Sequence, residues 1–373
     1  MPAVVVGAGG TGGHIFPGLA LADAIRRADP ASTVDFVGTR RGLEVRLIPE
    51  AGYPLHLIDV IPLRRKVGLE PLMAGPAFLR ATWQARRLLR SLGASVAVGM
   101  GGYPSLPVMA AAASLRLPSL LHESGAIPGL ANKIAGRLTH AIALSFDEAA
   151  VSFGRPTRTV GMPLSPELAH MDRAALRPRA RASYGLSDDL VAVLVMGGSL
   201  GALRLNELAL GLAARWRERS DVRIILKAGR DHMESTQTKL AEVGAEHLVH
   251  ATAFLDRMEL AYAAADVAIT RAGAGTVAEL PAAGLPAVLI PYPHAPGDHQ
   301  TLNAQPLVEA GAAYVVADAE AQPDRVGPLL EELIEDRARL ARMGAKAKTL
   351  ARPRAADELA EWVLDLAAQG KRR

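Results

Sequence analysis

The sequence predicts an α/β protein built from two parallel-sheet domains. Short β-branched runs alternate with helical patterns along the chain, which is typical of parallel sheets covered by helices on both faces. Two of the apolar runs end in glycine-rich turns about half the chain apart, at Gly7–Gly13 and Gly197–Gly201. The length of 373 residues fits two domains of ordinary size.

The composition limits the class of protein and its chemistry. Hydrophobic residues make up 50% and aromatic residues only 4%, so the cores are built mainly from Ala, Leu, Val and Ile. The absence of cysteine excludes disulfides, thiolate zinc sites and cysteine nucleophiles. A net charge of +4 is compatible with anionic partners such as phosphate-bearing lipids, and no nucleic-acid partner is expected. We expect a soluble chain without a signal peptide or membrane-spanning helix.

The predicted elements repeat one scheme in the two halves. After the opening run at Ala3, the first half has expected strands at Val34–Val37, Leu55–Val60, Val96–Val98, Ser119–Leu121 and Ala141–Leu144, with helices near 17–28, 71–92, 104–115 and 129–137. The second half has expected strands near 191–196, 222–227, 266–270, 286–290 and 313–316, with helices at 202–215 and 273–283. A domain boundary is expected near Val160–Ser165, and an amphipathic helix at Arg354–Ala368 ends the pattern.

Functional residues are expected in the loops that follow strands, because open parallel sheets bind ligands at the carboxyl ends of their strands. The first glycine turn, Gly7-x-Gly9-x-x-Gly12, matches a dinucleotide fingerprint. Arg40 and Arg41, after the second strand, suit a 2′-phosphate, so an NADP-dependent oxidoreductase is one alternative. His14 at the end of the loop and the second phosphate-type turn both argue against it.

A second glycine cluster, Arg271–Glu279, follows an expected strand in the second half. Gly273 and Gly275 permit close approach of a ligand to the backbone. Thr276 lies at a helix start, where it can meet a phosphate, and Glu279 lies one turn further on, suited to ribose hydroxyls. The same Thr-x-x-Glu spacing also fits a capping box, which would give both residues a purely structural role.

Three more loops carry polar groups. Pro291–Ala304 contains Asp298, Gln300 and Asn303, side chains that bind vicinal hydroxyls. Gly99–Ser105 offers a glycine-lined anion nest, and the loop after Ser119–Leu121 offers His122, Glu123 and Asn132. Asp-x-Asp, a Walker loop and a serine elbow are absent from the sequence, so neither metal nor cofactor is expected.

Together these motifs resemble one family over essentially the whole chain. The matching segments, in order, are Gly9–His14, Gly101–Ser105, His122-Glu123, Gly129–Lys133, Gly197–Ser199, Arg271–Ala274 and Gln300–Ala304. They resemble the MurG family, the transferases that add N-acetylglucosamine from UDP-GlcNAc to undecaprenyl-pyrophosphoryl-MurNAc-pentapeptide, converting lipid I to lipid II for peptidoglycan synthesis. The resemblance implies a GT-B fold, two Rossmann-like domains facing a deep cleft. It places an acceptor domain at 1–161 and a UDP-sugar domain at 162–351, with a C-terminal helix, about 352–368, packing back on the first.

The resemblance also implies roles for individual residues. The implied donor contacts are Glu279 at the ribose, Ser199, Ala274, Gly275 and Thr276 at the phosphates, Leu255 at the uracil, Gln300 at the sugar, and Thr11, Gly12 and Gly13 from across the cleft. The implied acceptor contacts are Gly10, Gly102, Tyr103, His122 and Asn132. His14 would be the general base that takes the proton of the muramyl 4-hydroxyl, with Glu123 as the alternative base, and the reaction would invert the anomeric centre.

Several positions depart from the family pattern. Ser124-Gly125, Met162, Ser165, Leu200 and Leu203 stand where the family commonly has other residues, arginines among them. A paralogue acting on another lipid-linked or secondary-metabolite acceptor is therefore an alternative. A missing arginine near a diphosphate removes a charge-assisted contact. Arg204 and Arg158 are the candidates to supply the missing positive charge.

The segment Leu63–Leu92 bears on localisation. It places basic residues beside apolar ones: Arg64, Lys66, Arg80, Arg86 and Arg87 with Leu72, Met73, Phe78, Leu79 and Trp83. That pattern suits an anionic membrane surface, and it also suits an ordinary amphipathic helix packed on the sheet. With the resemblance, it predicts a cytoplasmic protein held peripherally on the inner face of the cell membrane.

Overall fold

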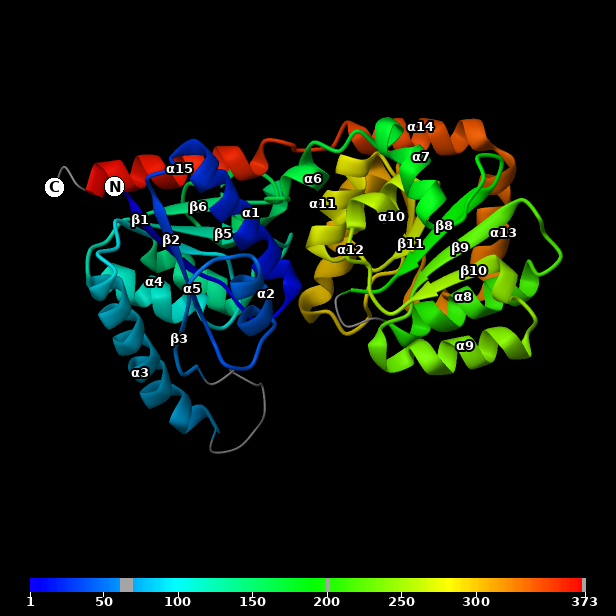
Figure 1. The fold of residues 1–373 in the computed structure, drawn as a ribbon. Helices are drawn as coiled ribbons and strands as arrows, with labels where there is room; N and C mark the ends of the chain where they lie inside the picture. The colour runs from blue at the N-terminus through cyan, green and yellow to red at the C-terminus, as the bar shows by residue number, and fades with distance from the viewer. Residues whose placement is uncertain (61–69, 199–201, 371–373) are drawn as a thin grey trace. The chain divides into compact units, whose positions relative to one another are not determined.

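The computed structural model describes the chain apart from residues 61–69, 199–201 and 371–373 and the side chains of residues 70–74. It divides into two compact units (Figure 1). Unit 1 comprises Met1–Ser165 together with Arg352–Arg373, and unit 2 comprises Pro166–Ala351. Over the described residues, none of the helices combines the length and the apolar character needed to cross a membrane.

Unit 1 is built on a seven-stranded parallel sheet with the order β3-β2-β1-β4-β5-β6-β7. Its strands are β1 Ala3–Gly7, β2 Thr33–Gly38, β3 Leu55–Leu57, β4 Val96–Gly99, β5 Ser119–Glu123, β6 Ala141–Leu144 and β7 Arg158–Thr159. Its helices are α1 Gly12–Ala28, α2 Glu44–Glu50, α3 Glu70–Ser91, α4 Ser105–Ser114, α5 Leu130–Leu138 and α15 Ala355–Gly370, with a 3₁₀ segment η1 at Asp147–Ser152.

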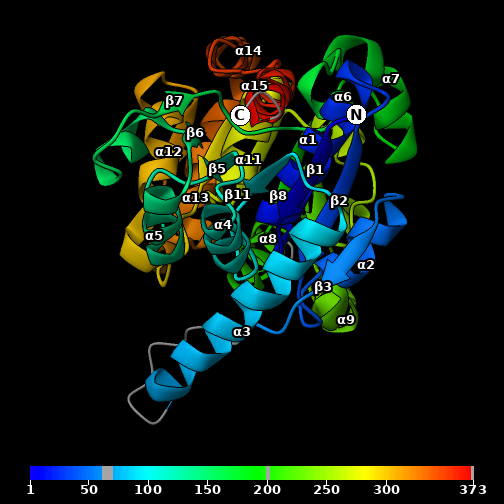
Figure 2. The same ribbon diagram turned by 90° about the vertical axis from the view of Figure 1, so that its left-hand side faces the viewer.

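Both faces of this sheet are covered, because successive strand residues point to opposite faces. Val4 and Val6 of β1 belong to one core, which α1 and α15 cover, and Val5 belongs to the core under α3 and α4. Helix α15 packs along α1, so the end of the chain returns to the unit that contains its beginning (Figure 1). Figure 2 shows α3 beside α4 and extending away from the sheet.

Unit 2 has a six-stranded parallel sheet with the order β10-β9-β8-β11-β12-β13. Its strands are β8 Val191–Met196, β9 Val222–Lys227, β10 Val249–Thr252, β11 Val267–Thr270, β12 Ala287–Leu289 and β13 Ala313–Val315. Its helices are α6 Pro166–Ala169, α7 Arg173–Ser183, α8 Leu203–Arg215, α9 Met233–Glu242, α10 Met258–Ala264, α11 Ala274–Ala283, α12 His299–Glu309, α13 Pro323–Glu335 and α14 Arg337–Lys348. Short 3₁₀ segments are η2 Arg230–His232, η3 Glu246–Leu248, η4 Pro296–Asp298 and η5 Asp318–Glu320.

The elements differ from the prediction in a few places. Strands β7 and β10 were not predicted, and β3 ends at Leu57 because the Asp59 amide donates to the side chain of Gln84 instead of a neighbouring strand. Helix α1 begins at Gly12, so Gly12 and Gly13 form its first turn although glycine disfavours helix. This start places His14 within the helix as well.

Candidate functional site

The carboxyl edge of unit 1 gathers the predicted acceptor-side residues. Strands β1 and β4 are neighbours at the centre of the sheet, where the strand order reverses direction. In open α/β sheets this switch point leaves a crevice in which ligands bind. The turns after β1, β4 and β5 carry Gly9–His14, Gly101–Ser105 and His122–Gly125 to this edge.

The turns after β1 and β4 pack against each other so closely that only glycine fits. A Cβ on Gly102 would lie 2.2 Å from the Gly9 carbonyl oxygen, and one on Gly101 would lie 2.6 Å from Cδ2 of His14. Both glycines also have a positive φ, 93° at Gly101 and 77° at Gly102. The His14 ring is therefore held against Gly101 at the start of α1.

A buried carboxylate that the sequence did not single out holds this arrangement. Glu44, the first residue of α2, is fully buried. Its Oε2 accepts the Gly10 amide at 2.9 Å, and its Oε1 accepts the Thr39 amide and hydroxyl at 3.0 and 2.8 Å. Glu44 thus joins the turn after β1 to the turn after β2. No motif spacing marks such a residue, because two of its three bonds come from backbone amides.

His14 lies in an environment that favours its neutral form. The ring is partly buried, and Nδ1 lies 3.5 Å from the Thr11 hydroxyl. Burial lowers the pKa of His14, while a hydrogen bond with the Gly9 backbone and the charge of Glu44 raise it by less. A neutral imidazole is the form that accepts a proton, so the site suits a general base.

His122 and Glu123 end β5 and are both buried. His122 Nε2 lies 3.0 Å from the Gly161 carbonyl, and burial lowers the pKa of the ring to about 4. Glu123 accepts the Gly125 amide at 2.8 Å and Nδ2 of Asn132 at 2.7 Å, and burial raises its pKa to about 7. The hydrogen bonds of these side chains hold the loop after β5 in place. Tyr103, also predicted to contact the acceptor, is 49% exposed.

In unit 2 the switch point lies between β8 and β11, and the backbone there is free to bind an anion. Helix α11 begins at Ala274 with Gly273 as its N-cap, a residue that has no side chain with which to cap the helix. Thr276 is therefore the third helical residue, so the capping-box interpretation of Thr276 and Glu279 is wrong. The amides of Ala274, Gly275 and Thr276 lack intrahelical acceptors, since they open the helix.

The side chain of Glu279 turns back toward this helix start. Its Oε2 accepts the hydroxyl of buried Tyr262 at 2.6 Å, and its Oε1 faces Gly275. Burial raises the pKa of Glu279, although the Tyr262 bond and the charge of Lys227 act in the opposite direction. Lys227, at the end of β9, is a second residue that the sequence analysis missed, because it ends an apolar strand pattern.

The other predicted donor residues are placed as follows. Gln300 accepts the Tyr292 amide at 2.9 Å through Oε1, which leaves its amide nitrogen available. Asn303 is fully buried and donates to the Ala272 carbonyl at 3.1 Å, supporting the loop after β11. Leu255 is buried in the loop after β10, and Thr11 and Gly13 are exposed on the unit 1 turn. Ser199 and Leu200 lie outside the described residues.

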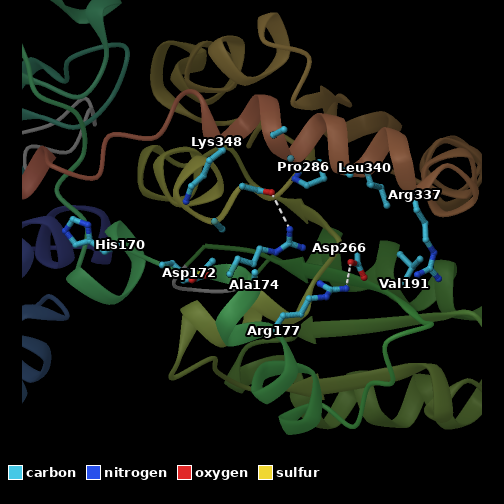
Figure 3. A pocket seen from close by; sticks show the side chains of 17 residues that line it. His170, Asp172, Ala174, Arg177, Val191, Asp266, Pro286, Arg337, Leu340 and Lys348 are labelled. Carbon is cyan, nitrogen blue, oxygen red and sulfur yellow. Dashed lines mark hydrogen bonds and ion pairs between the residues drawn. The ribbon is translucent and has the colours of Figure 1, made fainter.

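A hollow of about 750 Å³ lies in unit 2 at the opposite, amino edge of the sheet, beside Val191 and Asp266 (Figure 3). Two of its basic side chains, Arg173 and Lys348, are engaged with the ends of helices α10 and α11. Arg173 donates to the carbonyls of Ala265 and Gly284, and Lys348 donates to that of Ala282. These cations neutralise the negative ends of the two helices. We therefore assign these basic side chains of the hollow a structural role.

Comparison with known proteins agrees with this geometry. Residues 4–144 match the glycosyltransferase family 28 N-terminal domain, and residues 192–359 match the glycosyltransferase family 28 C-terminal domain. A Streptomyces coelicolor protein is 43% identical over 99% of this chain and 100% of its own length. A protein of Clavibacter michiganensis subsp. michiganensis is 40% identical over 99% of this chain and 97% of its own. Both are named UDP-N-acetylglucosamine–N-acetylmuramyl-(pentapeptide) pyrophosphoryl-undecaprenol N-acetylglucosamine transferase.

Solved structures give the same result. MurG of Acinetobacter baumannii aligns with a TM-score of 0.79 at 31% identity, over 98% of this chain and 100% of that one. A Staphylococcus aureus MnaA–UDP structure aligns at 0.69 with 13% identity over 98% of both chains, a likeness of fold alone.

The two parallel-sheet domains and the matches to both glycosyltransferase family 28 domains identify a glycosyltransferase of the GT-B fold. With 43% identity to a relative over the full length, the chain belongs to the MurG family. The oxidoreductase alternative is therefore set aside.

Proposed function

We propose that this chain transfers N-acetylglucosamine from UDP-GlcNAc to the 4-hydroxyl of MurNAc in undecaprenyl-pyrophosphoryl-MurNAc-pentapeptide, converting lipid I to lipid II with inversion. The full-length identity to transferases named for this reaction supports the substrates. The observation that carries the chemistry is the placement of His14: a partly buried imidazole with a lowered pKa, held against Gly101 on a glycine-lined turn.

On the donor side, unit 2 supplies binding groups of the right kind. The amides at the start of α11 suit the diphosphate, and Glu279 suits the ribose because a carboxylate accepts hydrogen bonds from two hydroxyls. Gln300 offers its amide nitrogen to the sugar. The helix N-terminus stabilises the negative charge of the departing UDP, a role that a metal has in other transferases.

On the acceptor side, His14 removes the proton of the attacking hydroxyl, and the muramyl oxygen bonds to the anomeric carbon as UDP leaves. The amides of the turns at Gly9–Gly13 and Gly101–Ser105 suit the acceptor's diphosphate. Glu123 is the second candidate for the base, since its pKa of about 7 is near neutrality. His14 is favoured, because both carboxylate oxygens of Glu123 already accept protein hydrogen bonds.

Product analysis tests the reaction. The protein is incubated with a lipid I analogue and, in separate samples, UDP-GlcNAc, UDP-GalNAc and UDP-glucose. We expect a disaccharide product from UDP-GlcNAc, with a β linkage. No product from lipid I, together with product from another lipid-linked or secondary-metabolite acceptor, would replace this proposal with the paralogue alternative that the departures at Met162, Ser165 and Leu200 leave open.

We also propose that unit 1 docks on an anionic membrane. Leu79 and Trp83 of α3 are exposed by 68% and 56%, with the Arg87 guanidinium 4.8 Å from the Trp83 ring centroid. Helix α5, which packs on α4 as α3 does (Figure 2), exposes a stripe of apolar residues beside Lys133 and Arg137: Leu130, Ile134 and Leu138. Exposed apolar groups beside cations are typical of membrane-surface helices. Arg64 and Lys66 of the predicted patch lie outside the described residues, as do the side chains of Leu72 and Met73.

Vesicle sedimentation tests this docking. We expect binding to phosphatidylglycerol vesicles and much weaker binding to phosphatidylcholine vesicles. Trp83→Glu and Leu130→Glu are expected to weaken it, and Val45→Glu is the matched control because Val45 is 44% exposed on α2, which packs with α1 over the other face of the sheet. Equal loss in all three variants would argue against a defined docking surface.

A further inference from the structure

We propose that Lys227 binds a phosphate of the UDP-sugar donor and thereby supplies the positive charge of the donor site. The inference rests on the proposed function and adds to it a residue that the family resemblance does not indicate. Lys227 is the last residue of β9, which lies next to β8 in the sheet, so its ammonium reaches the carboxyl edge where the second glycine turn begins.

The surroundings of Lys227 are those of the donor site. Its Nζ lies 3.4 Å from the carbonyl oxygen of Gly198 and 5.2 Å from the centroid of the Phe254 ring. Phe254 precedes Leu255, the residue predicted at the uracil. The charges of Lys227 and Glu279 also act on each other. Lys227 therefore lies among the elements predicted to hold the phosphates, the ribose and the base.

The ammonium is poorly compensated by the protein. The residue is only 8% exposed, yet among the described residues its side chain has no carboxylate within 4.0 Å. One long hydrogen bond to a carbonyl and an aromatic face do not satisfy the three donors of an ammonium. Burying a charge is costly unless it is paired, so the arrangement favours an anionic ligand.

Four arginines that are candidates for the same role already have protein partners. Arg271 forms an ion pair with Asp318, and Arg257 forms one with Glu259. Arg204, one of the two arginines considered as a replacement charge, donates to the carbonyls of Asp318 and Ala319. Arg158, the other, faces Glu358 and Trp362 in unit 1. Lys227 differs from these four arginines: among the described residues its ammonium has one carbonyl partner, that of Gly198, and no carboxylate within 4.0 Å.

The site selects a phosphate rather than a neutral group. The opening amides of α11 favour negative charge at the same edge. A phosphate oxygen accepts a charge-assisted hydrogen bond from an ammonium, which is about twice as strong as a bond between neutral groups. The ribose, by contrast, has Glu279 as its acceptor. Loss of the Lys227 charge should therefore weaken the binding of UDP and UMP, which carry phosphates. The binding of uridine, which carries none, should be unaffected.

The test is calorimetric titration of the full chain and its variants with UDP, UMP and uridine. Lys227→Met is expected to raise the Kd for UDP about tenfold and leave the Kd for uridine within twofold. Lys227→Arg, which keeps the charge, is expected to restore most of the UDP affinity. Arg223→Met, at the amino end of the same strand, is the matched control and is expected to bind UDP as the unsubstituted chain does.

Stability separates a binding role from a structural one. Lys227→Met replaces a buried charge that has no carboxylate partner among the described residues with an apolar side chain, so the Tm is expected to stay unchanged or rise. Two results would overturn the inference. One is a lower Tm together with an equal loss of affinity for UDP and for uridine. The other is an affinity for UDP equal to that of the unsubstituted chain. If the unsubstituted chain itself does not bind UDP, the proposed function fails and the inference fails with it.

Discussion

Two carboxylates, one at the carboxyl edge of each sheet, have different surroundings: Glu44 is fully buried and Glu279 is partly buried. Glu44 in unit 1 accepts three hydrogen bonds, from the Gly10 amide and from the amide and hydroxyl of Thr39. Glu279 in unit 2 accepts one described bond, from Tyr262, and lies near the undercompensated Lys227. A carboxylate whose two oxygens both accept bonds from neighbouring turns fixes those turns, whereas one with an oxygen that has no partner among the described residues remains available to a ligand.

The same contrast extends to the glycines of the two edges. Gly101 and Gly102 are required by contact, since a Cβ on either would enter another turn. Gly273 has no atom within 4 Å of such a Cβ, and the nearest atom to Gly275 is Oε1 of Glu279 at 3.7 Å. The unit 1 edge is thus packed around its imidazole, and the unit 2 edge is open. We infer that the first is built for chemistry and the second for binding.

His14→Ala is the strongest test of this assignment of chemistry to unit 1 and binding to unit 2. Removing a general base typically lowers turnover by about 10² to 10⁴-fold. We expect such a fall in kcat with lipid I analogues, while the Kd for UDP stays within about twofold. His56→Ala, a histidine paired with Asp35 at the edge of the same sheet, serves as the control. Unchanged turnover would remove His14 from the mechanism and favour Glu123.

Close packing of the two turns predicts the next largest effect. Gly102→Ala places a Cβ 2.2 Å from the Gly9 carbonyl oxygen in addition to its strain at φ 77°. Gly52→Ala has the same kind of strain at φ 78° with nothing within 4 Å. Strain alone costs about 1 kcal/mol, so Gly102→Ala should lower the free energy of unfolding by more than Gly52→Ala does. Equal losses in urea titrations would mean that the turns are not packed as described.

Glu44→Gln tests whether the buried carboxylate acts on His14. The Glu44 charge raises the pKa of His14, so its removal should lower that pKa further. The base is then neutral down to lower pH, and the acid limb of kcat/KM should move to lower pH. The lost carboxylate bonds should also cost about 1 to 3 kcal/mol of stability. A stability loss with an unmoved pH profile would leave Glu44 a structural role only.

The smallest expected effect comes from Glu279→Gln in unit 2. An amide has one acceptor oxygen where the carboxylate has two, and it carries no charge. We expect the Kd for UDP and for uridine to rise together, by about tenfold or roughly 1.4 kcal/mol, with little change in the free energy of unfolding. A large stability loss without a change in binding would make Glu279 resemble Glu44 and would remove the distinction between the two edges.

Much of this protein was determined by local sequence. Alternating apolar runs and helical patterns specify parallel strands and covering helices, since each element needs a partner surface to bury. Glycines after the strands marked both carboxyl edges, because few other residues allow such turns. The order of the motifs also identified the family and placed His14 and Glu279 at those edges.

The tertiary structure alone decided which polar groups are already occupied. His122 bonds to Gly161, Glu44 binds the turn at Gly10, and Lys227 has no carboxylate partner in the part of the chain that the structure describes. Each of these depends on residues far apart in the chain that meet only when the strands align. A sequence pattern reports the period and the local conformation of the backbone, but the hydrogen-bond partner and the burial of a side chain are set by elements brought next to it in folding.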